Sequence, residues 1–361
     1  MWPILKNGTI FGTTNLNQAL RSSFVRALLK KHFMKNIAVF FSILFLLSSC
    51  KEKSNYKYLP ESIGQVQSIL VVMEEDLWES AVGDSVRKAF MSPIKGLAVA
   101  EPAHHIQYIP PSVFKGTVKQ NRTVLAVGLD SLSLAHMKKD VYARPQLIGV
   151  VKGVDQADVM QQFQAKKGDF ITAFKALEID QTQERFKRSL NQEKGIENLL
   201  GVGVDIPSAY RLGMQTESFA WIDRAIPAGS TNLIAYALPY NSFDNPETFI
   251  EDIVAARDSV VKIHIPGPDV PGKKTYMKTE TVFMPYVFPV EIGGMKGVEV
   301  RGIWEMHNYP MAGPFVSYIL NDPSRDRKIV LEGFVFAPNK EKRPHLFELE
   351  AIVKTLHPVQ R

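Results

Sequence analysis

The chain has 361 residues, of which 45% are hydrophobic and 22% are charged. This is the composition of a folded globular protein, and the length is enough for about two domains. The sequence contains one cysteine, which excludes a disulfide framework and any metal site built from several cysteines.

The net charge of +6 comes entirely from the first 50 residues. That segment contains six Lys and Arg and no Asp or Glu, so residues 51–361 hold 37 basic and 37 acidic residues. A nucleic-acid-binding protein needs a basic face on its folded part. The balanced charge gives no sign of such a face, and we therefore expect no nucleic-acid partner.

An uncharged apolar run, IAVFFSILFLL, occupies residues 37–47. It is too short to span the roughly 30 Å of membrane hydrocarbon, but it has the length of a signal-peptide core. Because Met34-Lys35-Asn36 supplies a short positive region just before it, we predict a signal peptide at 34–49. Residues 1–33 would then be an upstream extension. The alternative is that they form a genuine long n-region.

The apolar run ends in Leu47-Ser48-Ser49-Cys50. This segment resembles the bacterial lipobox, which implies diacylglycerol transfer to Cys50, cleavage before it, and acylation of the new amine by a chain such as palmitate. One acyl chain binds a membrane only marginally, whereas two or three anchor stably. The resemblance therefore implies a lipid-anchored cell-envelope protein, at the outer membrane, with residues 50–62 as lipidated Cys and tether. The alternative is a buried Cys that ends an apolar helix.

Residues 63–198 are predicted to form an N-terminal domain that is α/β-like. Buried strands are expected near 66–73, 122–128 and 146–152, because these runs are short and apolar. A helix should run from Glu74 to about Phe90, and two more should begin at Asp155 and Asp169. Three prolines make 99–120 a loop with short extended pieces.

From Gly195–Gly203 onward the pattern becomes rich in strands, and residues 199–361 are predicted to be an antiparallel α+β domain. Asn245-Pro246 is a typical helix start, and a last helix is expected at 342–356. Together they would cover one antiparallel sheet. The expected strands lie near 202–206, 210–212, 219–224, 232–238, 278–292, 297–306, 315–320 and 328–336.

Residues that could carry catalysis or bind a metal are sparse. His104 and His105 are adjacent, so on a strand they point to opposite sides, and we interpret them as surface-loop residues, not metal ligands. No Gly-x-Ser-x-Gly elbow, dinucleotide fingerprint or phosphate loop occurs in the sequence. We therefore expect no metal and no cofactor, and we assign no catalytic residue.

Aromatic residues are concentrated in the second half of the chain. Trp221, Trp304 and Tyr236 are candidate ligand-binding residues, since such rings offer flat apolar area with polar tips. The alternative is that they are sheet core and cross-strand pairs.

Eight segments carry a resemblance to a known family: Asp76–Arg87, Pro93–Leu97, Glu101-Pro102, Ile109–Phe114, Asn121-Arg122, Ile206–Tyr210, Phe219–Trp221 and Glu332–Pro338. Together they resemble the domain-of-unknown-function family 4837, lipoproteins of Bacteroidota envelopes, over about residues 60–358. No activity or catalytic residue comes with this family. The pair Asp223-Arg224 departs from the basic residues expected after Phe219-x-Trp221. The second half is also similar to the PsbP and Mog1 sandwich, a sheet closed by a C-terminal helix.

Two classes of function fit these observations. The first is a non-catalytic binding or assembly lipoprotein with an envelope protein or a glycan as partner. The alternative is an envelope hydrolase with a scattered active site, because catalytic residues need only meet in space.

Replacement of the lipidation site tests the anchor. Cys50→Ser should block acylation and move the protein from the membrane fraction to the soluble fraction. Mass spectrometry of the wild-type protein should find an acylated Cys50 at the new N-terminus. An unmodified Cys50 within an uncleaved chain would contradict the prediction.

Overall fold

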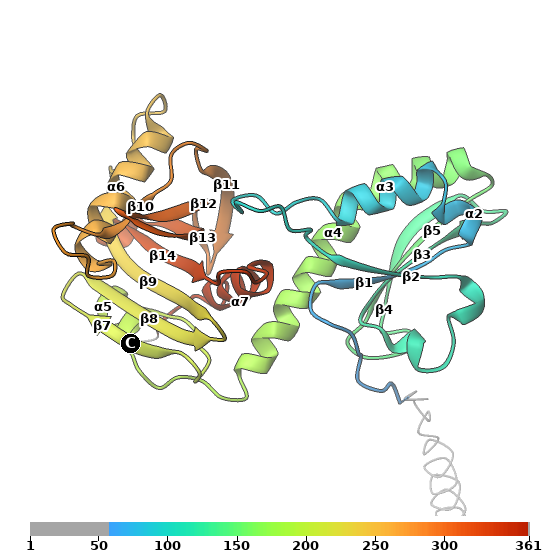
Figure 1. The fold of residues 1–361 in the computed structure, drawn as a ribbon. Coiled ribbons are helices and arrows are strands. Elements are labelled where there is room, and N and C mark those ends of the chain that lie inside the picture. Colours follow the sequence, from blue (N-terminus) through green and yellow to red (C-terminus); the bar gives the residue numbers. More distant parts are fainter. Residues whose placement is uncertain (1–57, 360–361) are drawn as a thin grey trace, which may run out of the picture. The chain divides into compact units, whose positions relative to one another are not determined.

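The computed structural model describes residues 58–359, and the chain from Leu59 onward forms one compact unit. Two large sheets organise it (Figure 1). The predicted upstream extension, signal peptide and Cys50 lie outside the described residues.

The first sheet has five strands in the order β2-β1-β3-β5-β4. Its first four strands are parallel, and β4 runs antiparallel to β5 at the edge. All five residues of β1, SILVV, are buried, which explains why this strand reads as a continuous apolar run. The strands are β1 (Ser68–Val72), β2 (His105–Ile109), β3 (Thr123–Leu129), β4 (Leu134–Lys139) and β5 (Leu147–Gly153).

Between β1 and β2 the chain forms two short helices, α2 (Glu75–Trp78) and α3 (Ala81–Phe90). The Oγ of Ser80 accepts a hydrogen bond from the Val82 N–H at 3.2 Å and caps α3. Because β1 and β2 are parallel neighbours in the sheet, the chain must cross over between them, and these helices form the crossover. The N-terminal half is therefore α/β-like, as predicted.

The long helix α4 (Gln156–Phe186) begins at Asp155, whose carboxylate accepts from the Asp158 N–H at 2.9 Å. The predicted interruption near Gly168 is wrong. A glycine inside a helix costs about 1 kcal/mol of helix propensity, and the packing of Phe163 and Phe170 against the first sheet on either side of Gly168 offsets this cost.

Helix α4 contributes to two hydrophobic cores. Phe163, Phe170 and Phe174 pack with the first sheet and α3, whereas Ile179 and Phe186 pack with the second sheet. In sequence the segment beyond Phe174 is densely charged. The burial of its few apolar residues shows that α4 is shared by both halves of the chain.

The second sheet is antiparallel, in the order β10-β12-β13-β14-β9-β8-β7, with β11 pairing β12 as well. Helix α6 (Phe249–His264) covers one face, and α7 (Arg343–Val353) with α5 (Gly195–Leu200) covers the other. The α+β fold class is thus confirmed. The strands are β7 (Arg211–Gln215), β8 (Phe219–Ile226), β9 (Gly229–Pro239), β10 (Tyr276–Thr279), β11 (Tyr286–Ile292), β12 (Met295–His307), β13 (Tyr309–Asp322) and β14 (Arg327–Phe336).

Three predicted details of the C-terminal half differ in the structure. The single strand expected near 278–292 is two strands, β10 and β11, separated by residues 280–285. The strand expected at 202–206 is reduced to β6 (Val202–Gly203), which pairs with β15 (His357–Pro358). Helix α6 starts at Phe249 and not at Asn245, because the Asn245 side chain accepts from the Glu247 N–H at 3.1 Å and holds a turn there.

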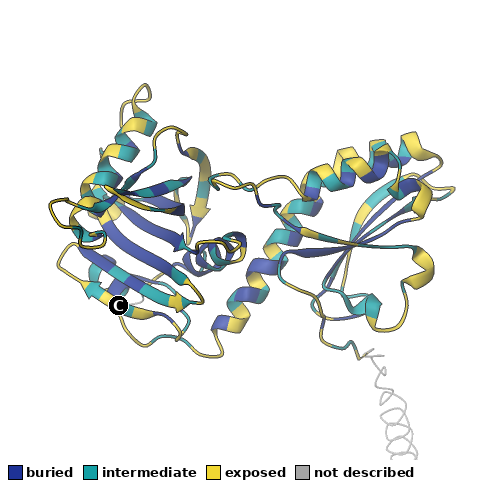
Figure 2. Cartoon of the chain, in the orientation of Figure 1, coloured by how far each residue is buried: buried dark blue, intermediate teal, exposed yellow. Residues whose placement is uncertain are grey.

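The central strands of both sheets are buried, and the outer faces of the helices are exposed (Figure 2). Within residues 58–359, no helix is both long enough and apolar enough to cross a membrane.

Candidate functional site

A loop that joins α3 to β2, residues 93–103, leaves the first sheet and crosses onto the second. Gly96 in this loop has φ +82°, and a Cβ there would lie 2.9 Å from the main-chain carbon of Arg301. Glycine is therefore needed for the conformation and for the close approach to β12.

The carboxylate of Glu101 fixes this loop to α7. It accepts hydrogen bonds from the N–H of Lys342 at 2.8 Å and from the N–H of Arg343 at 2.8 Å. These are free donors at the N-terminus of a helix, where a negative charge is also favourable. The Nη1 of Arg343 completes the attachment by donating to the Pro102 carbonyl at 2.9 Å.

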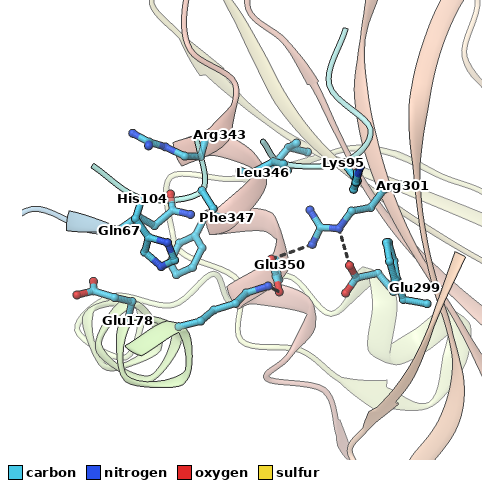
Figure 3. A pocket seen from close by; sticks show the side chains of 14 residues that line it. Gln67, Lys95, His104, Glu178, Glu299, Arg301, Arg343, Leu346, Phe347 and Glu350 are labelled. Atoms are coloured by element: carbon cyan, nitrogen blue, oxygen red, sulfur yellow. Dashed lines mark hydrogen bonds and ion pairs between the residues drawn. The ribbon is translucent and has the colours of Figure 1, made fainter. Parts of the chain in front are cut away.

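Glu350, on α7, lies at the centre of a buried ion network. Its carboxylate is 3.0 Å from Arg301 Nη2 of β12 (Figure 3). It is also 2.6 Å from Lys175 Nζ of α4 and 2.7 Å from Lys354 Nζ. Burial opposes ionisation of Glu350, but these three cations outweigh it and hold the pKa well below its ordinary value. The carboxylate therefore stays charged and joins three elements.

A cavity of about 260 Å³ lies beside this network (Figure 3). The loop 93–103, α4, α7 and β12 all contribute to its walls. Its lining residues are Gln67, Ile94, Lys95, Ala103, His104, Lys175, Glu178, Phe288, Glu299, Arg301, Arg343, Leu346, Phe347 and Glu350.

His104 is buried in this cavity wall, so the prediction of a surface loop is wrong for it. His105 is exposed as expected, but it begins strand β2 and does not lie in a loop. The Nδ1 of His104 lies 3.1 Å from the Phe90 carbonyl oxygen. Because a carbonyl only accepts, Nδ1 carries the hydrogen and Nε2 is a free acceptor. Burial lowers the pKa of His104 to about 4, the Phe90 bond opposes the shift, and Arg343 adds to it.

Glu178 and Gln67 form the part of the wall next to the first sheet. The Glu178 carboxylate takes a bidentate pair from Arg122, with Nε at 2.8 Å and Nη2 at 3.1 Å. Gln67 precedes β1, is 7% exposed, and has φ +58°, a left-handed conformation that few residues other than glycine adopt.

A second and larger hollow, of about 520 Å³, adjoins the cavity, since Ile94, Lys95 and Arg301 line both. It lies where the chain between β10 and β11 departs from β12. We call it the apolar groove. Its lining residues are Pro93, Ile94, Lys95, Gly96, Leu97, Ala98, Ala100, Glu280, Phe283, Met284, Tyr286, Arg301, Gly302, Ile303 and Ala312.

The rim of the apolar groove exposes large hydrophobic side chains. Val282 is 82% exposed and Phe283 70% exposed, and Met284, Tyr286 and Phe288 are at least 40% exposed. Contiguous exposed apolar residues of this size are typical of interaction sites.

The three aromatic residues proposed as ligand contacts lie elsewhere. Trp304 is fully buried and donates to the Val335 carbonyl at 3.3 Å, and Tyr236 is 2% exposed. Trp221 is partly exposed and donates to Asn232 at 3.1 Å. All three pack in the core between the sheet and α6. None lines the cavity or the groove, so their binding role stays a prediction.

The polar residues that do meet at the cavity come from distant parts of the sequence and carry no local motif. One of them, Glu350, could have been recognised from the sequence. It shares a helix face with Leu346, Leu349 and Val353, so it is an acid at a core position of the helix. Within residues 58–359, no three His, Cys, Asp or Glu side chains gather closely enough to hold a metal ion.

Two families match this chain. Residues 189–355 match a domain of unknown function, DUF4837, which confirms the resemblance to that family. Residues 62–187 match a different domain of unknown function, DUF8532, so the expected extent of the first family over 60–358 is corrected. The two matched stretches follow one another along the chain without overlap.

Solved structures add distant similarities. A crystal structure from Bacteroides thetaiotaomicron VPI-5482 matches with 12% identity and a TM-score of 0.25, covering 45% of this chain and 46% of that one. The Saccharomyces cerevisiae Ran-binding protein Mog1p matches with 9% identity and a TM-score of 0.29, covering 44% and 90%. A Pseudomonas aeruginosa protein of unknown function, PA94, matches with 14% identity and a TM-score of 0.25, covering 44% and 99%. No curated protein matches the sequence.

The lowered pKa of His104 predicts a pH dependence of stability. Above pH 6.5 the histidine is neutral in both states, whereas between pH 6.5 and about 4 only the unfolded state takes up the proton. As the pH falls from 6.5 to about 4, the free energy of unfolding should therefore decrease by about 3 kcal/mol because of His104.

Urea unfolding of wild type and of His104→Gln between pH 7 and 4 measures this contribution. The difference between the two pH profiles should equal the His104 contribution, whereas His136→Gln, at an exposed site, should leave the profile unchanged. Parallel profiles for wild type and His104→Gln would show that His104 titrates normally.

Proposed function

We propose that this protein is a lipid-anchored binding protein of the cell envelope, at the outer membrane, that holds an apolar segment of an envelope protein without catalysis. The observation that carries the proposal is the apolar groove with its exposed rim at Val282, Phe283 and Met284. The lipobox at Cys50 supports the anchoring and the location.

The groove has the size and the residue types of a binding site. Its 520 Å³ falls in the range of known ligand pockets, about 300–1,000 Å³. Phe, Tyr, Met and Arg are enriched at the centres of protein–protein interfaces, and the groove offers Phe283, Met284, Tyr286 and Arg301. This composition favours a protein segment as the occupant.

The groove is built from both family domains. Pro93–Ala100 belongs to the DUF8532 match, and Glu280–Ile303 belongs to the DUF4837 match. Strand β11, next to the groove, pairs with β12 on one side and has no partner strand on its other side among residues 58–359. An extended partner segment in the groove would run beside this free edge.

The alternative is an envelope hydrolase with a scattered active site. His104 is the buried base that such a mechanism would use, because it lines the cavity and its Nε2 is left as an acceptor when Nδ1–H donates to the Phe90 carbonyl. A general base works best when its pKa is near the operating pH, and about 4 is too low for efficient proton transfer near neutrality. This favours binding over hydrolysis.

Site-specific photo-crosslinking followed by affinity capture from envelope membranes tests the proposal. A photoreactive residue at Phe283 should crosslink one envelope protein, whereas one at Ile263, an equally exposed site on α6, should not. Phe283→Asp should weaken capture at least roughly tenfold while thermal stability is unchanged, as expected for loss of an aromatic hot spot.

The control Ile263→Asp should leave capture unchanged. Equal crosslinking from both positions, or capture that survives Phe283→Asp, would contradict the groove as binding site. Capture of a glycan and no protein would show that the partner is a glycan and not an envelope protein. Turnover of an envelope substrate by wild type, lost in His104→Gln, would favour the hydrolase.

A further inference from the structure

We propose that the amino edge of the first sheet binds the anionic lipid headgroups of the membrane that holds the anchor. The amino edge is the end of the sheet at which the parallel strands β3 and β5 begin, at Thr123 and Leu147. This docking rests on the lipid anchor of the proposed function and is independent of the apolar groove.

The described part of the chain starts at this edge. The Arg144 N–H, just before β5, donates to the Pro60 carbonyl at 2.8 Å, and the Ser62 N–H donates back to the Arg144 carbonyl at 3.2 Å. The Ile63 N–H donates to the carbonyl of Gln120, just before β3, at 3.0 Å. Residues 60–63 are therefore fixed to the amino edge.

The connection from the lipidation site to this edge is short. Leu59 follows Cys50 by nine positions, and an extended chain covers at most about 3.6 Å per residue, so the span is at most roughly 32 Å. Of the surfaces of the described chain, the amino edge is the one attached to the anchor by the shortest length of chain.

Five cationic residues gather at the amino edge. Lys138 and Lys139 end β4, and the antiparallel register places them opposite the first residues of β5. Two more lysines lie at the two ends of the 3-10 helix η2 (Gly116–Gln120), which leads into β3. The side chain of Arg144 is 69% exposed. We call these residues the basic edge: Lys115, Lys119, Lys138, Lys139 and Arg144.

Few carboxylates oppose the basic edge. Its four lysines form no ion pair with any residue in 58–359. Arg144 pairs with Asp140 at 3.0 Å, and the exposed Glu61 lies beside Arg144 in a backbone bridge. Two acids against five cations leave this edge positive.

The opposite, carboxyl edge of the same sheet is acidic. Residues 74–76, which follow β1, are all Glu or Asp, and Asp155 follows β5. Asp130 follows β3 and pairs with Lys152. The charges of the two edges offset one another in the total, which explains why the balanced composition does not reveal the basic edge. An anionic surface would attract the amino edge and repel the carboxyl edge.

Aromatic and apolar side chains accompany the basic edge. Phe114 and Tyr142 pack edge to face with ring centroids 5.8 Å apart, and Lys119 Nζ lies 5.0 Å from the centre of the Tyr142 ring. At the chain start, Tyr58 is 88% exposed and Ile63 is 46% exposed. Tyrosine and lysine are typical of the headgroup region, because the apolar part enters the interface while the polar end stays with water and phosphate. This mixture favours a membrane surface over a soluble anion.

Fluorescence quenching of the full-length lipidated protein in vesicles tests the docking. With the lipid on Cys50, an introduced cysteine is the one free thiol, so a fluorophore can be attached at Thr117→Cys beside the basic edge or at Ser131→Cys on the carboxyl edge. The quencher is carried by lipid headgroups, in vesicles of phosphatidylcholine alone or mixed with phosphatidylglycerol. Phosphatidylglycerol should increase quenching severalfold at position 117 and not at position 131, and high salt should reverse the increase.

A pair of double variants tests the residues. Lys138→Gln with Lys139→Gln should lower the ratio of docked to undocked protein at least roughly tenfold, since each lysine near an anionic surface contributes about fivefold. The matched control, Lys273→Gln with Lys274→Gln, removes two adjacent exposed lysines from the loop before β10 and should leave quenching unchanged.

Three results would overturn the docking. They are quenching at position 117 that does not depend on phosphatidylglycerol, quenching that survives Lys138→Gln with Lys139→Gln, and reversal by inorganic phosphate at constant ionic strength, which would assign the basic edge to a soluble anion. Loss of the protein from phosphatidylcholine vesicles would contradict the lipid anchor instead. The basic edge should in that case still recruit the protein to phosphatidylglycerol vesicles, and failure to do so would also overturn the docking.

Discussion

A single buried carboxylate, Glu350, connects the parts of this structure that form the candidate sites. An unpaired charge in a protein interior costs several kcal/mol, so Glu350 is tolerated only where cations surround it. Those cations come from α4, β12 and α7. The packing of α4 against α7 therefore depends on electrostatic pairing as well as on the apolar contacts of Ile179 and Phe186.

The cavity and the groove follow from this arrangement. Once α4 is held against α7, the loop 93–103 reaches the second sheet, where Glu101 caps α7 and Gly96 contacts β12. Both contacts join residues that are more than 200 positions apart in sequence. The loop forms part of the wall of both hollows, so each hollow requires both family domains.

The sequence predicted the elements well where burial produces a simple pattern. The apolar run of β1 and the helical spacing of α3 and α7 were readable because each has a defined buried face. Strand β4 was not predicted, because it is a half-exposed edge strand that ends in Lys138 and Lys139, which is a common protection of sheet edges. Two helices, beginning at Asp155 and Asp169, were predicted in place of α4 because helix propensity is local, whereas the contacts of Phe170 and Phe174 with the sheet are tertiary.

The candidate sites could not be predicted in the same way. Gln67, His104 and Arg343 line one cavity only after the chain has folded, and none of them lies in a motif. The aromatic residues were conspicuous in sequence, but large rings are also what a sheet core requires, and Trp304 and Tyr236 are buried there. The acid at position 350 on the apolar face of α7 is a signal that the sequence interpretation missed, because a carboxylate at a core position needs a partner.

A double-mutant cycle between Glu350 and Lys175 tests this account most directly. Urea unfolding should show that Glu350→Gln lowers the free energy of unfolding by about 3 kcal/mol, because it leaves the surrounding cations without their anion. The control Glu184→Gln, in an exposed ion pair, should cost less than about 0.5 kcal/mol. With Lys175→Met added, the coupling energy should be about 1 kcal/mol, reduced by the partial exposure of Lys175. A Glu350→Gln protein as stable as wild type, with no coupling to Lys175, would contradict the account.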